Sequence, residues 1–281
     1  MRFDILTIFP EALEGLFSVG VIGQARETGL IAIHLHDLRD YTDDPHRVVD
    51  DRPYGGGPGM VMKIEPFVRA MEAIRPQSGA SVRTVLLSSQ GRLFRQSDAK
   101  RWASLDGLIL LCGRYEGVDE RIVEFVDEEI SIGDYVLTGG EAAAAVAVEA
   151  TARMTPGVVG RFDSVESDSF YRESTRLGAP QYTRPPVFRG HEVPEILQSG
   201  DHARIEAYRE AEAWRKTARV RPDLLGLNPE PSSEGTPEQP APPQPEQQSE
   251  GLPEQSDAGT PEQPSEALAE QPNVEGMKRN G

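Results

Sequence analysis

The chain has 281 residues, with 46 acidic and 29 Lys or Arg side chains and a net charge of −17. This length is enough for one or two domains with a sizeable core. The single cysteine, Cys112, excludes an internal disulfide and a cysteine-rich zinc site, and we expect it to be buried at a strand end. The first apolar run is interrupted by Asp4 and ended by Pro10, so we expect no signal peptide or membrane span and a cytoplasmic protein.

Strand-like and helix-like segments alternate along the first part of the chain. Apolar or alternating residues predict strands over 3–9, 31–38, 82–87 and 108–111. Helical patterns begin at Pro10 and cover 64–74, 96–105 and 141–153. This alternation predicts an α/β fold with a mainly parallel sheet, and we place the first domain at 1–160.

The remaining chain has three parts of different composition. Residues 161–190 show little periodicity, which predicts an interdomain linker with polar side chains facing a partner or substrate. Helical patterns over 192–198 and 201–220 predict a small α-helical domain at 191–228. Residues 229–281 are rich in Pro, Glu, Gln, Ser and Gly and carry 11 acidic and 2 basic residues, which predicts a disordered acidic tail. A solvated extension is favoured over an arm that competes with nucleic acid for basic patches.

The stretch from Cys112 to Glu141 combines short apolar runs with glycine-bearing turns. The glycines are Gly113, Gly117, Gly133, Gly139 and Gly140, and the polar residues beside the turns are Arg114, Tyr115, Glu116 and Asp134. Glycine allows close approach, so backbone groups can bind a small polar ligand at the carboxyl ends of strands. Tight strand-to-helix turns are the alternative.

A second glycine-rich stretch, RPYGGGPGM, covers residues 52–60. It matches neither the dinucleotide-binding nor the phosphate-loop fingerprint. A loop that folds over substrate, with Arg47 or Arg52 on phosphate, is as consistent with the sequence as a surface Ω-loop. His34 and His36 share one face of a predicted strand, but no third metal ligand lies nearby, which favours a polar surface.

Three carboxylates, Asp163, Glu166 and Asp168, lie in the poorly periodic linker. One of them could act as a general base, and such a base contributes about 10² to 10⁴ in rate. Ordinary loop acidity, or helix N-capping by Asp168, is the alternative that composition favours.

Several long motifs stand in a fixed order: RPYGGGPGM at 52–60, LSSQGR at 87–92, CGRYEG at 112–117, DER at 119–121, SIGDYVLTGGE at 131–141, TPGVVG at 155–160 and YTRP at 182–185. In these motifs the chain resembles the bacterial tRNA (guanine-N1)-methyltransferases, the TrmD family of the SPOUT class, from Met1 to about Asn228. The resemblance implies a deep trefoil knot whose loops bind S-adenosylmethionine in a bent shape. Periodicity predicts only the sheet, because knots are rare in proteins.

The resemblance also implies which residues form the cofactor pocket, mostly through their backbone groups. They are Leu86, Leu87, Ser89, Gly113, Tyr115, Glu116, Ile132, Gly133, Asp134, Tyr135, Val136, Leu137, Gly139 and Gly140. Two positions depart from the family pattern, since Ser89 and Ala143 stand where proline is common.

The same resemblance assigns the catalytic residues. Asp168, in SDSF at 167–170, matches the family's general base, which removes the N1 proton of guanine 37 just 3′ of the anticodon. Arg153 matches the arginine that stabilises charge on O6 of that guanine. Glu116 is implied to place the guanine or a magnesium ion, with an acidic cap beside Arg114 as the alternative.

The partners implied are tRNA and a second subunit, in a homodimer with a composite active site. The acidic total does not exclude RNA, because residues 153–189 and 201–221 each carry six basic and four acidic residues. Two alternatives remain: a related knotted methyltransferase acting on another RNA position, such as a ribose 2′-hydroxyl, and a non-catalytic RNA-binding module. Dependence of the activity on Asp168 separates them.

Overall fold

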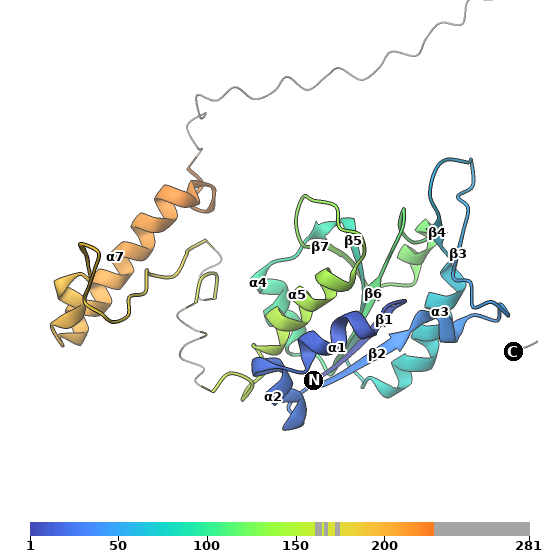
Figure 1. The fold of residues 1–281 in the computed structure, drawn as a ribbon, viewed down its shortest axis with the longest axis horizontal. Helices are drawn as coiled ribbons and strands as arrows, with labels where there is room; N and C mark the ends of the chain where they lie inside the picture. Colours follow the sequence, from blue (N-terminus) through green and yellow to red (C-terminus); the bar gives the residue numbers. More distant parts are fainter. Residues whose placement is uncertain (161–164, 166–167, 172–174, 228–281) are drawn as a thin grey trace, which may run out of the picture. The chain divides into compact units, whose positions relative to one another are not determined.

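The computed structural model describes residues 1–160, 165, 168–171 and 175–227, so the predicted tail lies outside the described residues. Its centre is a five-stranded sheet in the order β2-β1-β6-β5-β7 (Figure 1). The strands are β1 Arg2–Thr7, β2 Ala32–Asp37, β5 Val82–Leu93, β6 Gly107–Cys112 and β7 Glu128–Ser131. Every neighbouring pair is parallel, which confirms the predicted α/β fold class with a mainly parallel sheet.

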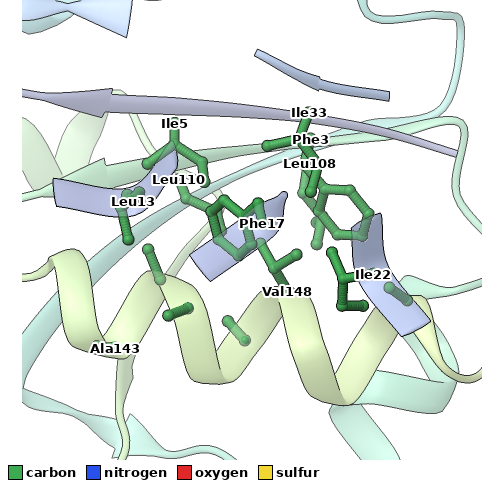
Figure 2. Packing of buried hydrophobic residues seen from close by; sticks show 14 of the residues in the cluster. Phe3, Ile5, Leu13, Phe17, Ile22, Ile33, Leu108, Leu110, Ala143 and Val148 are labelled. Atoms are coloured by element: carbon green, nitrogen blue, oxygen red, sulfur yellow. The ribbon is translucent and has the colours of Figure 1, made fainter. Parts of the chain in front are cut away.

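Helices cover both faces of this sheet (Figure 1). They are α1 Glu11–Phe17, α2 Gly20–Glu27, α3 Ile64–Ile74, α4 Gln96–Trp102 and α5 Glu141–Ala152. On one face, Phe3 and Ile5 of β1 pack with Phe17 of α1 and Val148 of α5 (Figure 2). On the other face, Leu6 of β1 packs in a cluster with residues of α3.

Strand β6 shows why its sequence is an uninterrupted apolar run. Leu108 and Leu110 belong to the cluster under α1 and α5, whereas Ile109 and Leu111 belong to the cluster under α3. A strand covered on both faces needs apolar residues at every position. The last residue, Cys112, is fully buried, as predicted, and burial raises the pKa of its thiol.

Shorter elements connect the sheet. They are β3 Asp50–Asp51 and β4 Val61–Met62, which pair antiparallel, and the 3-10 helices η1 Leu38–Tyr41, η2 Arg75–Gln77 and η3 Glu120–Glu124.

The strand predicted over 82–87 is too short, because β5 continues to Leu93 after a break in register with β7 between Leu87 and Arg92. Helix α2 and strand β7 were not predicted. Pro10 is the residue before α1 rather than its first residue.

The C-terminal part contains the hairpin β8 Val187–Phe188 and β9 His191–Glu192, followed by η4 Glu195–Gln198, α7 His202–Val220 and η5 Pro222–Leu225. The helix predicted over 192–198 is wrong at its start, because Glu192 closes the hairpin. The helix predicted over 201–220 is confirmed, with the Asp201 side chain accepting a hydrogen bond from the backbone N–H of Arg204. The segment before the hairpin is held to α7, since the backbone N–H of Leu177 donates to Thr217 Oγ1 at 3.1 Å.

A buried carboxylate stabilises the start of the sheet. Asp4 on β1 is fully buried and accepts hydrogen bonds from Arg2 Nε at 2.7 Å and Ser78 Oγ at 2.8 Å, while His36 Nε2 lies 2.8 Å from its Oδ1. Burial raises the pKa of this carboxyl, but the hydrogen bonds from His36, Arg2 and Ser78 outweigh burial and lower the pKa to about 2. His36 is therefore a partner of Asp4 rather than part of a polar surface, which corrects that prediction.

We expect Asp4 to make stability depend on pH in acid. Its pKa is lower in the folded than in the unfolded protein, so its contribution is complete above about pH 4 and disappears as the pH falls toward about 2. The shift corresponds to about 2 kcal/mol. Urea unfolding at several pH values between 6 and 2.5 should show a shallower decline in Asp4→Asn than in the wild type; equal declines would show that Asp4 is not the group responsible.

Candidate cofactor site

A cavity of about 250 Å³ opens where β6 and β7 end and where β5 leaves its register with β7. Its wall contains Leu86 and Leu87, where β5 loses its register with β7, Gly113 directly after β6, and Ser131 at the end of β7. Parallel sheets bind ligands outside the carboxyl ends of their strands, so the position of the cavity agrees with that rule.

The cavity gathers almost all residues for which the sequence predicts cofactor contacts. Those in its wall are Leu86, Leu87, Ser89, Gly113, Tyr115, Glu116, Ile132, Gly133, Tyr135, Val136, Leu137, Gly139 and Gly140. Asp134 is the exception, because its side chain is exposed to solvent and is not in the wall. Three turns far apart in the sequence therefore share one concave surface.

Close backbone contacts explain the glycine at one of these turns. The backbone N–H of Gly140 donates to the carbonyl of Gly113 at 2.9 Å. A Cβ at position 140 would lie 2.7 Å from the Cα of Cys112, which no side chain can tolerate without moving the strand end. The turn after β6 also needs unusual backbone geometry, since Tyr115 has φ 61° and Gly117 has φ 124°. Glycine adopts this region at no steric cost, whereas tyrosine must be held in it by its neighbours.

The second glycine-rich stretch ends beside the turn that carries Glu116, although none of its residues lines the cavity. The backbone N–H of Glu116 donates to the carbonyl of Met60 at 3.0 Å, and that of Met62 donates to Gly117 at 2.9 Å. Loop 52–60 is therefore fixed to the turn that carries Glu116. The side chain of Arg47 forms ion pairs with Asp37 and Asp40, so the structure gives no support for Arg47 as a phosphate ligand.

The predicted catalytic residues divide into two places. Glu116 is in the wall of the cavity, whereas Arg153 and Asp168 are not. These two form an ion pair after the end of α5, with Arg153 Nη2 at 2.5 Å from Asp168 Oδ2 and each side chain 44% exposed. Asp163 and Glu166 lie outside the described residues. The predicted base and the predicted arginine are thus together in this chain, and neither lines the cavity.

Comparison with known proteins assigns the family. A sequence model described as tRNA (Guanine-1)-methyltransferase TrmD matches residues 1–227. The chain belongs to this family. Curated relatives named tRNA (guanine-N(1)-)-methyltransferase include those of Anaeromyxobacter sp. strain Fw109-5 at 52% identity and Geobacter metallireducens at 50%, covering 80% of this chain and 90% and 91% of theirs. A third, from Dehalococcoides mccartyi, is 48% identical with 80% and 90% coverage.

Membership of the TrmD family implies the SPOUT class, with which the parallel sheet agrees. Both departures from the family pattern are in the cavity wall, since Ser89 and Ala143 line it. Arg114 and Gly117, which the glycine-bearing stretch had indicated, also line the cavity. Wall residues that the sequence did not single out as ligand contacts are Ser88, Gln90, Val118, Glu120, Ile122, Glu129, Ile130, Ser131 and Thr138. Most of these lie within or directly beside one of the motifs, so proximity to the glycine turns was the available signal.

The described residues contain neither a cluster of metal-ligating side chains nor a helix that could span a membrane. In that part of the chain no three His, Cys, Asp or Glu side chains are grouped so that they could hold a metal ion, and magnesium gains no support. His34 and His36 have ring centroids 6.4 Å apart, but Nε2 of His36 is directed to Asp4. None of the described helices is long and apolar enough to cross a membrane.

Proposed function

We propose that this enzyme transfers a methyl group from S-adenosylmethionine to N1 of guanine 37 in tRNA, just 3′ of the anticodon, giving 1-methylguanosine. The family match over residues 1–227 supports tRNA (guanine-N1)-methyl transfer. The observation that carries the finer assignment is the cavity, whose wall contains the turns that the motifs predict as cofactor loops. We also propose the trefoil knot and a cytoplasmic location.

The cavity suits S-adenosylmethionine by its chemistry. The cofactor supplies a methyl group on a positively charged sulfonium. Carboxylates of Glu116, Glu120 and Glu129 are in the wall, and the only arginine there among the described residues, Arg114, is already paired with Glu141. These carboxylates favour a cationic ligand.

Asp168 and Arg153 supply complementary functions at the guanine. N1 carries a proton and is a poor nucleophile, so Asp168 would accept that proton as N1 bonds to the methyl carbon, while the carbon–sulfur bond of the sulfonium breaks and S-adenosylhomocysteine leaves as a neutral thioether. As the proton leaves, negative charge develops on O6, where the guanidinium of Arg153 would stabilise it. Their ion pair at 2.5 Å supports this assignment, because it keeps the two groups close enough to act on neighbouring atoms of one base. Glu116, in the cavity wall, positions the guanine; no step is assigned to magnesium.

We propose a homodimer in which the site is composite. Arg153 and Asp168 are not in the wall of their own subunit's cavity, and a reaction requires them beside the bound methyl group. The cavity of one subunit would therefore receive the linker, 161–190, and the helical domain, 191–228, of the other. We propose that the chain has two further parts, the cofactor-binding domain at 1–160 and the tail at 229–281.

The C-terminal part offers contacts for tRNA. Helix α7 carries cations without ion-pair partners among the described residues, namely Arg204, Arg209, Lys216 and Arg219. The β8–β9 hairpin adds Phe188, which is 60% exposed and lies under the guanidinium of Arg189. Cations bind phosphates, and exposed aromatic rings stack on bases that are splayed out of a loop.

The deciding experiment is transfer of labelled methyl from S-adenosylmethionine to unmodified tRNA transcripts that carry guanine or adenine at position 37. We expect incorporation only with guanine, recovered after digestion as 1-methylguanosine. Label on a ribose 2′-hydroxyl would favour the related methyltransferase activity. Tight tRNA binding without incorporation would favour a non-catalytic RNA-binding module.

A further inference from the structure

A buried carboxylate lies directly behind the cofactor cavity. Glu141, the first residue of α5, is 5% exposed and is not itself in the cavity wall. The hydroxyl of Thr7, at the end of β1, donates to Glu141 Oε1 at 2.6 Å. On the other side, Arg114 donates to Glu141 Oε2 from Nε at 3.0 Å and forms an ion pair through Nη2, also at 3.0 Å. We call this arrangement the Thr7–Glu141–Arg114 contact chain.

Arg114 connects the two loops that form most of the cavity wall. It belongs to the turn after β6 and lines the cavity, and its Nη1 donates to the carbonyl of Thr138 in the other loop at 3.4 Å. Its backbone also forms an isolated antiparallel bridge with Gly139. The guanidinium also lies over the ring of Phe9, with its Cζ 4.5 Å from the ring centroid.

The contacts of its guanidinium give Arg114 a structural role between the two loops. Its Nε and Nη2 are directed to Glu141 and its Nη1 to Thr138, so three of the five N–H donors of the guanidinium face protein groups. The planar fork of arginine can satisfy both partners at once, whereas the single ammonium of lysine cannot match that geometry.

We propose that Arg114 and Glu141 are positioning residues for the cofactor: the contact chain holds the turn at 113–117 and the loop at 132–140 at the separation that S-adenosylmethionine requires. This inference rests on the proposed function. The hydroxyl of Thr7 holds the carboxylate of Glu141 from the end of β1. The contact chain therefore connects both loops to a central strand of the sheet. Misplacing binding groups by about 1 Å can cost about 10²-fold.

The test compares Arg114→Lys and Glu141→Gln with a matched control, Arg26→Lys. Arg26 is 24% exposed, against 23% for Arg114, and likewise contacts one carboxylate, Glu14, and one backbone carbonyl, that of Phe17, but it is not in the cavity wall. Calorimetry would measure the dissociation constants of S-adenosylmethionine and S-adenosylhomocysteine. Steady-state kinetics with saturating tRNA would separate kcat from KM for the cofactor, and thermal unfolding would follow the fold.

We expect both cofactor affinities to fall by about tenfold to a hundredfold in Arg114→Lys and Glu141→Gln. The KM for tRNA should remain close to that of the wild type, and Arg26→Lys should bind the cofactor normally. A further pair, Thr7→Ser and Thr7→Val, tests the far end of the contact chain and avoids altering a charge. The serine variant keeps the hydroxyl and should bind as the wild type does, whereas the valine variant should bind more weakly.

The positioning role would be overturned if the wild type binds the cofactor and Arg114→Lys and Thr7→Val bind it with the same affinity. The proposed function would then remain intact. Equal losses in Arg114→Lys and Arg26→Lys would also overturn it, since the effect would then be one of general stability. Absence of cofactor binding by the wild type would overturn the proposed function itself and the inference with it.

Discussion

Replacing Asp168 with asparagine is expected to reduce methyl transfer by about 10² to 10⁴-fold while leaving cofactor binding unchanged. Asparagine keeps the size of the side chain and can still contact Arg153, but its amide cannot accept the N1 proton of guanine. Asp168 is not in the cavity wall of its own subunit, and in the proposed dimer it acts on the guanine rather than on the cofactor, so affinity for S-adenosylmethionine should not respond. Single-turnover transfer to a guanine-37 transcript, with calorimetry of the cofactor, measures both quantities.

Asp43→Asn provides the matched control for Asp168→Asn. Asp43 forms an ion pair with Arg69 at 2.5 Å, the same separation as in the Arg153–Asp168 pair, but it is 85% exposed and far from the predicted site in the sequence. The control should retain full activity. Full activity in Asp168→Asn would instead remove this carboxylate as the base and favour an RNA methyl transfer that does not need one.

The second large effect is expected for Gly140→Ala, which should weaken cofactor binding by about 10²-fold. The added Cβ would meet the Cα of Cys112 at 2.7 Å and its Cβ at 3.1 Å, so relief requires movement of the strand end or of the loop that lines the cavity. Overpacking of this kind also costs about 1 to 3 kcal/mol of stability. Cofactor calorimetry and urea unfolding of the same preparation measure the two effects.

Gly15→Ala separates steric overlap from the mere addition of a methyl group. Gly15 lies in α1, and a Cβ there would have nothing within 4 Å. Alanine favours a helix over glycine by about 1 kcal/mol, so this variant should be slightly more stable and bind the cofactor normally. If Gly140→Ala also bound the cofactor normally, the close contact between the turn at Gly140 and Cys112 would not be needed for cofactor binding.

The sequence predicted those elements whose own residues determine their structure. Helix α3 and strand β6 have clear amphipathic or fully apolar patterns, and the structure confirms both. Helix α2 begins with Gly20 and also contains Gly23, so its helix propensity is low and packing of Ile22 in the core determines it. Strand β7 has only four residues, two of them glutamates, and forms because β5 offers an edge.

The candidate site likewise has features that the sequence predicts and features that only the fold reveals. Glycine turns are visible in the sequence because backbone approach and positive φ both require that residue, and Gly140 and Gly117 illustrate the two cases. The partner of Arg114 is not visible, because Glu141 is brought to it only when α5 returns to the strand ends. No local pattern links Thr7 to Glu141, which are 134 residues apart. Tertiary contacts of this kind need the fold.

The order of the strands also has a consequence for synthesis of the protein on the ribosome. Strand β6 lies between β1 and β5, so Arg2 pairs with Gly107 and the two flanking strands emerge before the one that joins them. Until Cys112 has been translated, one edge of β1 and both edges of β5 present unpaired backbone groups to other nascent chains. Pairing between residues so distant is slow. The first hundred residues should therefore benefit most from chaperones that shield strand edges during translation.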